Sequence, residues 1–148
     1  MRVMALLLAL FGATCSRAPE PRSLADEHAR VDELLRVGEL GRAERELDGM
    51  WRALRQAHAE STAFGQQALQ DVAFRLGQVM LDEKKPGEAL EVCTRGLALG
   101  EPDDLFTANL LILRGTIHQE LGKSSAAADD FHQALVINEK LLQKVLHP

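Results

Sequence analysis

The stretch LFTANLLILRGTIHQELGKSSAAADDFHQALVINEKLL, residues 105–142, decides the fold. Its first half is an apolar run at helical spacing that ends at Gly122, and glycine is the residue type that most often follows the last turn of a helix. A Lys-Ser-Ser turn comes next, and a second amphipathic run begins at Ala126. Two helical runs joined by so short a turn predict an antiparallel helical hairpin.

Small and aromatic residues follow a recognisable order in this hairpin. In chain order they are Leu111, Gly115, His118, Ala127, Phe131 and Ala134. This order resembles the tetratricopeptide repeat, in which a Trp-x2-Leu-Gly-x2-Tyr helix packs on an Ala-x3-Phe-x2-Ala helix. Small residues allow two helix backbones to approach closely, and the resemblance implies that Phe131 fills the layer between neighbouring hairpins. The chain departs from the pattern at Arg114, His118 and Glu139, where the family has Leu, Tyr and Pro.

Two weaker copies of the hairpin precede this one. An alanine opens the second helix of each copy, at Ala43, Ala89 and Ala127, and a glycine stands five residues earlier in the first and third copies. The spacings are 89 − 43 = 46 and 127 − 89 = 38 residues, against 34 in the family. We therefore expect an all-α domain over residues 23–146, with antiparallel hairpins at about 23–60, 62–99 and 103–146. The resemblance implies that they stack as a right-handed solenoid. An up-down helical bundle with ordinary short loops is the alternative.

Several residues predict where the helices begin and end. Ser23 followed by Asp26 is a capping-box pattern, and Pro86 suits the first position of a helix. Asp103 or Asp104 is expected to cap the fifth helix, and Ser124 or Ser125 the sixth. The second helix is expected to extend to about Glu60.

Composition favours a helical fold and argues against one class of function. Leu and Ala lead a hydrophobic fraction of 46%, which favours helices because runs of β-branched residues are absent. The formal net charge is −5 with acids and bases interspersed, which argues against a nucleic-acid partner.

The N-terminus has the pattern of an export signal. Arg2 precedes an apolar run from Val3 to Phe11, which is too short to span a bilayer, and the small residues Gly12-Ala13-Thr14 lead to Cys15. This arrangement resembles a bacterial lipoprotein signal. The resemblance implies a signal peptide over residues 1–14, a lipid on Cys15 and a membrane tether over 15–22. In such families a serine after the cysteine, here Ser16, goes with the outer membrane of Gram-negative cells. The alternatives are an ordinary cleaved secretion signal, and an uncleaved anchor or a wrongly assigned start of the chain.

No residue pattern predicts catalysis. None of the five histidines lies in a His-Glu-x-x-His motif or a Cys/His cluster, so no metal site and no cofactor is expected. Asp129 and Asp130 are adjacent in one helix, where their side chains diverge by about 100° and make a poor acid–base pair. Cys93, among apolar residues, is expected to be a small buried side chain. We therefore expect a protein without enzymatic activity.

The repeat family uses the first helix of each hairpin to line a groove that receives a peptide or a helix of a partner. Carried over by position, the partner-binding residues implied here are His28, Asp32, Leu35, Asp71, Phe74, Arg75, Gln78, Asn109, Ile112, Leu113 and Thr116. Their mixture of apolar and charged side chains suits a partly apolar segment that carries charge. The basic residues with which some family members hold a chain-terminal carboxylate are not evident.

These features predict a scaffold in the cell envelope. It would face the periplasm from a lipid on Cys15 and bind a peptide segment of another envelope protein, in support of a larger complex; a secreted or soluble periplasmic protein is the alternative location. The competing hypothesis is a small structural bundle without a groove that associates with copies of itself. The run from Leu105 to Ile117 is apolar around most of its circumference. Such a helix must be covered nearly all round, either by its own chain or by a partner.

Overall fold

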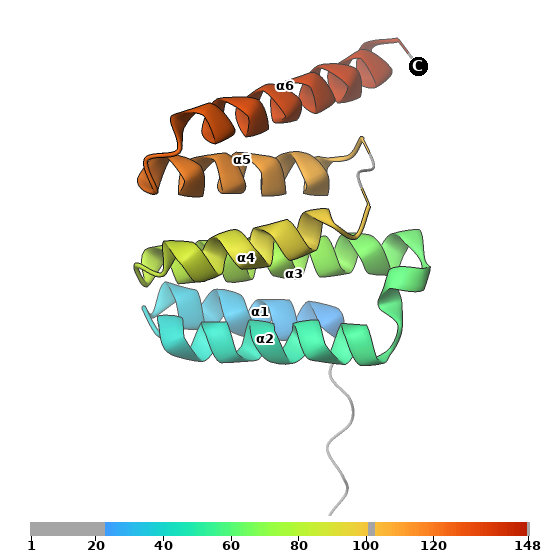
Figure 1. The fold of residues 1–148 in the computed structure, drawn as a ribbon. Helices are drawn as coiled ribbons and strands as arrows, with labels where there is room; N and C mark the ends of the chain where they lie inside the picture. The colour runs from blue at the N-terminus through green and yellow to red at the C-terminus, as the bar shows by residue number, and fades with distance from the viewer. Residues whose placement is uncertain (1–22, 101–102, 148) are drawn as a thin grey trace, which may run out of the picture.

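The computed structural model describes residues 23–100 and 103–147, and this part of the chain is all-helical (Figure 1). A single turn of 3₁₀ helix, Ala59–Ser61, separates the second and third α-helices. The α-helices are α1 (Leu24–Arg36), α2 (Leu40–Gln56), α3 (Ala63–Asp82), α4 (Pro86–Leu97), α5 (Leu105–Glu120) and α6 (Ser124–Leu146).

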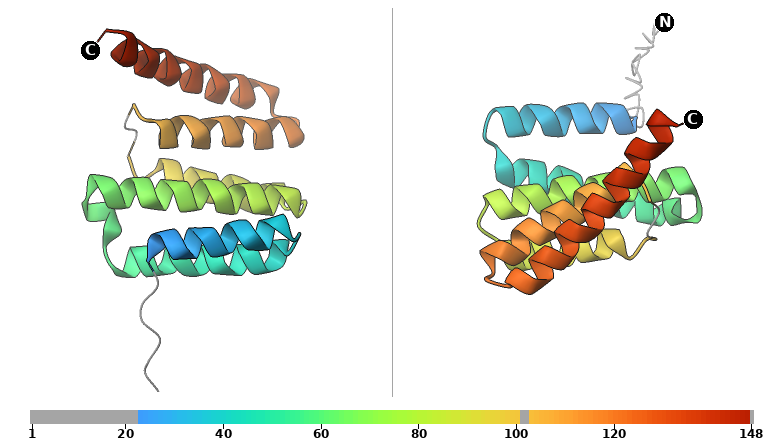
Figure 2. Two further views of the ribbon diagram at one scale, coloured as in Figure 1. Left: turned by 180° about the vertical axis from the view of Figure 1, so that it is seen from behind. Right: turned by 90° about the horizontal axis from the view of Figure 1, so that it is seen from above.

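Each helix packs against the next along the chain, and α3 also packs against α5. The stack rises from the α1–α2 pair through α3 and α4 to α5, and α6 crosses obliquely at the top (Figures 1 and 2). Among the described residues, the backbones of α1 and α3 do not contact each other, and the backbone of α6 contacts only α5. At each end of the stack, the backbone of the last helix therefore contacts that of one neighbouring helix only.

The same turn closes all three hairpins. After α1, α3 and α5 the chain passes through one residue with a left-handed backbone, Gly38 (φ 77°), Lys84 (φ 63°) or Gly122 (φ 71°). In each turn the following amide donates to the carbonyl five residues earlier, from Glu39 to Leu34, from Lys85 to Met80 and from Lys123 to His118. This is the Schellman arrangement, which satisfies the last free carbonyls of a helix. The alanines five residues beyond these turns, Ala43, Ala89 and Ala127, are all buried.

Helix ends follow the sequence at most positions. Ser23 and Asp26 form the predicted capping box, Pro86 is the first residue of α4, and Asp104 accepts a hydrogen bond from the Thr107 amide. Two predictions were wrong. The second helix ends at Gln56 rather than near Glu60, because His58 (φ 53°) turns the chain before the 3₁₀ helix. The sixth helix begins at Ser124 with Lys123 as its cap residue, and no side chain caps it. The Lys123 amide donates to the His118 carbonyl in the preceding turn.

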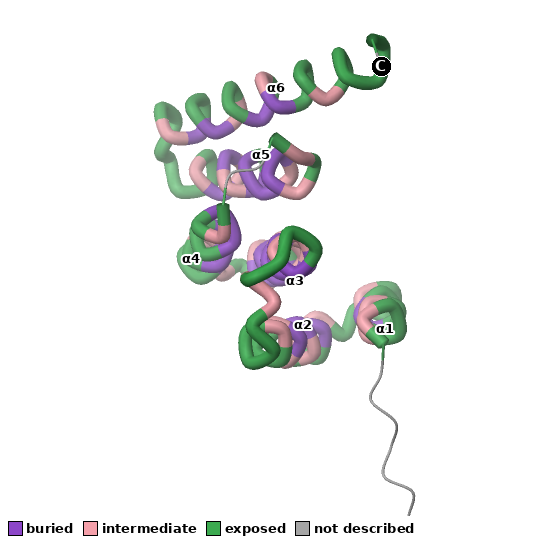
Figure 3. Tube along the Cα trace, turned by 90° about the vertical axis from the view of Figure 1, so that its right-hand side faces the viewer, coloured by how far each residue is buried: buried purple, intermediate pink, exposed green. Residues whose placement is uncertain are grey.

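The core runs through the whole stack, and α5 lies inside it (Figure 3). Helices α3, α4 and α6 all pack against α5, and Leu110 and Ile117 are fully buried. This apolar helix is thus covered largely by its own chain, although Leu105 and Ile112 remain exposed. Close approach depends on Gly96 of α4, where an added Cβ would lie 2.8 Å from the Cβ of Ala73 and 3.0 Å from Leu110.

The contact between α5 and α6 differs from the expectation in one respect. The ring of Phe131 packs over Gly115, so close that an added Cβ there would lie 2.7 Å from the ring. Phe131 therefore fills a gap within the last hairpin rather than between hairpins. Both departures from the repeat pattern in α5 face one carboxylate: Arg114 binds Asp130 through two hydrogen bonds, and the Nε2 of His118 lies 3.8 Å from it.

Candidate partner-binding groove

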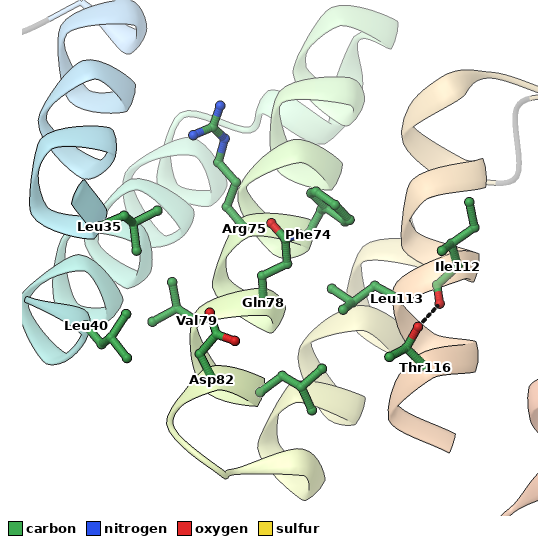
Figure 4. A pocket seen from close by; sticks show the side chains of 11 residues that line it. Leu35, Leu40, Phe74, Arg75, Gln78, Val79, Asp82, Ile112, Leu113 and Thr116 are labelled. Carbon is green, nitrogen blue, oxygen red and sulfur yellow. Dashed lines mark hydrogen bonds between the residues drawn. The ribbon is translucent and has the colours of Figure 1, made fainter. Parts of the chain in front are cut away.

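A cavity of about 480 Å³ opens between α1, α3 and α5, and we call it the groove (Figure 4). Helix α3 forms most of its surface, α1 and α5 form its sides, and the first residue of α2 closes one corner. The residues that line it are Leu35, Leu40, Phe74, Arg75, Gln78, Val79, Leu81, Asp82, Ile112, Leu113 and Thr116.

Most of the positions predicted to bind a partner meet at this groove. Those that line it are Leu35, Phe74, Arg75, Gln78, Ile112, Leu113 and Thr116. They come from three helices far apart in the sequence, and the stacking of α3 against α5 brings two of those helices together.

The other four predicted residues do not line the groove. His28, Asp32 and Asp71 belong instead to ion pairs between α1 and α3, described below. Asn109 is half-buried on α5, three residues before Ile112, and is not among the lining residues.

Sequence reasoning missed four lining residues. Val79 follows Arg75 by four residues, and Asp82 follows Gln78 by four. The helical periodicity of α3 therefore places both on the face already predicted to bind a partner. Leu81 lies beside Asp82 at the end of the same helix. Leu40 belongs to the first turn of a second helix, and the family pattern gives no reason to place such a residue at the groove.

The groove exists because α1 stands away from α3. Side chains, rather than backbone contacts, connect the two helices: Arg75 Nη1 lies 2.7 Å from Asp32 Oδ1, and His28 Nε2 lies 3.4 Å from Asp71 Oδ2. On α1 these pairs involve His28 and Asp32, which precede Leu35. Beyond them the space between the helices is open, and Leu35 projects into it (Figure 4).

The walls of the groove are mainly apolar, with polar groups at intervals. Leu35 and Phe74 are half-buried, and Ile112 is 41% exposed, which leaves apolar surface without a protein neighbour. The Thr116 hydroxyl donates to the Ile112 carbonyl at 3.0 Å, and the Gln78 amide is exposed to solvent. Such a surface is able to bind apolar side chains and to orient them by a few hydrogen bonds.

A second cavity of about 330 Å³ lies between α4, α5 and α6, and Leu97, Leu111 and Ile137 are among the residues that line it. It contains none of the residues predicted to bind a partner. Cys93 lies in the core, and burial raises the pKa of its thiol to about 12, so the thiol is protonated and unreactive at neutral pH. Within residues 23–100 and 103–147, no group of three or more His, Cys, Asp and Glu residues is placed to hold a metal ion.

The predicted signal peptide, Cys15 and the tether lie outside the described residues. Of the helices that the structure describes, none combines the length and the hydrophobicity needed to cross a bilayer. Compared with protein-family models, with curated proteins and with solved structures, the chain matches none of them.

Proposed function

We propose that the protein is a non-enzymatic interaction module whose groove binds a peptide or a helix of a partner protein. The observation that carries this proposal is the gathering of Leu35, Phe74, Ile112 and Leu113 around one open cavity. Apolar side chains that remain partly exposed in a concave surface gain free energy when a partner covers them, about 25 cal/mol for each Å² removed from water. No catalytic motif in the sequence assigns another use to the residues of this surface.

We further propose that the three hairpins form a right-handed solenoid of the tetratricopeptide type. The recurrence of one turn geometry after α1, α3 and α5 supports this arrangement, as does the packing of α3 against both α2 and α5. In such a stack each unit contacts only its neighbours, and the end units expose surface that a partner can cover.

The location that fits an interaction module with this N-terminal sequence is the cell envelope. We propose that Cys15 carries the lipid, that the domain faces the periplasm from the outer membrane, and that it supports assembly of a larger envelope complex. If Cys15 is not acylated, the same domain would be a secreted or soluble periplasmic protein. Mass spectrometry of the purified protein distinguishes the two, because acylation adds a large mass at a new N-terminal cysteine.

The groove is tested by affinity capture after cross-linking in the native membrane. The variant Leu35→Asp/Phe74→Asp/Ile112→Asp should lose the partner, because three charges would then line the apolar walls. The matched control is Phe64→Asp/Leu105→Asp, which places charges on exposed apolar residues that line neither the groove nor the outer side of α6. Circular dichroism must show that both variants retain their helices. Capture that survives the groove substitutions would refute the proposal.

A second candidate function is self-association through α6. Its outer side carries four large apolar side chains, each more than half exposed: Leu135, Leu142, Val145 and Leu146. Their spacing of 7, 10 and 11 residues from Leu135 places them on one side of the helix, whose C-terminal end projects beyond α5 (Figure 1). Sedimentation velocity of residues 23–148 tests this candidate. A monomer at every concentration would reject it, and a dimer abolished by Leu142→Asp would favour it over the groove.

A further inference from the structure

The only positive charge among the groove residues is already neutralised. Arg75 Nη1 is 2.7 Å from Asp32, and Arg75 Nε is 3.3 Å from Asp71. Asp71 in turn lies 3.4 Å from His28. Arg75 is thus held between two carboxylates, and a partner's carboxylate would have to displace one of them to reach it. An acidic segment, or a free chain terminus, gains little electrostatic free energy here.

A negative charge stands at the other end of the groove. Asp82 is the last residue of α3, it is exposed, and its carboxylate lies at the groove (Figure 4). None of the ion pairs between described residues includes Asp82. Lys85, three residues later, does not pair with Asp82. Its ammonium lies 2.8 Å from both Glu44 and Glu83, and hydrogen bonds to these carboxylates raise the pKa of Lys85.

The groove region therefore carries an excess of negative charge. One arginine, Arg75, stands against three aspartates, Asp32, Asp71 and Asp82, and the formal charges of these four residues sum to −2. Charge complementarity at an interface selects the partner and speeds its association more than it adds affinity. Among segments whose apolar side chains cover the walls, the groove would therefore prefer one with a cationic side chain near Asp82.

We propose that the segment received by the groove is a short apolar peptide or helix with a lysine or arginine that pairs with Asp82. The inference rests on the proposed binding function, and it adds the chemistry of the partner. Apolar side chains of the segment lie against Leu35, Phe74 and Ile112, and its cationic side chain reaches the open end of α3. Binding weakens as ionic strength rises, because the pair is exposed to solvent.

The test is selection of peptides from a random display library on the full chain. Clones enriched on the wild type should combine apolar residues with Lys or Arg, and an enriched Asp or Glu would overturn the inference. The clone most enriched is then synthesised in three forms, with its cation kept, changed to Gln, or changed to Glu, and each dissociation constant is measured by fluorescence anisotropy. The Gln form should bind about two- to fivefold more weakly, the range for one exposed ion pair, and the Glu form more weakly still.

Two variants of the protein separate the inference from the proposed function. In Asp82→Asn the three peptides should bind almost equally, whereas Asp129→Asn, an exposed aspartate on α6, should leave their order unchanged. If Asp82→Asn preserves the preference for the cation, the partner's charge does not contact Asp82 and the inference is wrong, while the groove stands. If no clone is enriched, or if Leu35→Asp/Phe74→Asp binds every clone as the wild type does, the groove itself is wrong and the inference falls with it.

Discussion

The pair formed by Arg114 and Asp130 offers a sharp test of how α5 and α6 are held together. Asp130 is 3% exposed, and Arg114 Nε and Nη2 donate to its two oxygens at 2.9 and 2.5 Å. Replacing Arg114 by leucine introduces the residue that the tetratricopeptide pattern has at the corresponding position, but it leaves a buried carboxylate without its main partner. His118 Nε2, at 3.8 Å, is too far away to replace the lost hydrogen bonds.

The expected cost follows from this burial. Removing one partner of a fully buried pair destabilises a protein by about 3–5 kcal/mol. The Arg114 side chain keeps 23% of its surface in water, so solvent reaches the vacated space, and we expect a loss of about 2–4 kcal/mol in the free energy of unfolding. For a chain of this size that corresponds to a fall of roughly 5–15 °C in Tm.

Urea unfolding followed by circular dichroism at 222 nm measures the effect. Arg36→Leu is the matched control, because Arg36 pairs with Glu33 on the surface of α1, and its unfolding midpoint should not change measurably. The double variant Arg114→Leu/Asp130→Leu should recover at least half of the loss, since replacing both partners by apolar groups leaves no unpaired charge. An Arg114→Leu protein as stable as the wild type would show that Asp130 is hydrated in solution and that the reasoning is wrong.

Three further predictions concern the backbone and the core. Lys84→Gly should stabilise the protein by about 0.5–1 kcal/mol in thermal unfolding, because Lys84 has the left-handed backbone that glycine adopts without strain; a loss of stability would contradict this. Gly96→Ala should lower the free energy of unfolding by about 1–3 kcal/mol, because the new Cβ would lie 2.8 Å from the Cβ of Ala73. Gly49→Ala should instead stabilise the protein in the same assay, because no atom lies near its new Cβ and alanine favours the helix. Thiol reagents should label Cys93 only after unfolding. The folded thiol keeps its proton up to about pH 12, whereas the unfolded thiol loses it near pH 9. The free energy of unfolding should therefore fall above pH 9, by up to about 1.4 kcal/mol per pH unit relative to Cys93→Ala. Equal pH profiles of the two proteins would refute the burial of this thiol.

The sequence predicted the helices well, because the signals that define them are local. The capping box at Ser23, the proline at the start of α4 and the periodicity of apolar residues all act within a few residues of chain. The prediction failed at the end of α2, which was expected near Glu60: the chain turns at the left-handed residue His58, and the helix ends at Gln56. Left-handed backbone at a residue other than glycine is not readable from one sequence.

The groove was predictable in part. Family positions on α1, α3 and α5 named most of its residues, because side chains on one face of a helix recur every three to four residues. They did not reveal that His28, Asp32 and Asp71 are engaged in ion pairs rather than facing the cavity. The carboxylate at the open end, Asp82, was also missed, because its role depends on where the end of one helix lies relative to two others.

The sequence by itself determined that this part of the chain is helical, where most of its helices begin, and which side of most of them is apolar. These properties follow from interactions among near neighbours in the chain, which any single segment contains in full. Only the tertiary structure decided that α1 stands apart from α3 and leaves the groove open, that Arg75 is neutralised while Asp82 is not, and that Arg114 finds Asp130. Ion pairing and cavity shape depend on distances between segments as many as 43 residues apart, and those distances are fixed only when the helices pack.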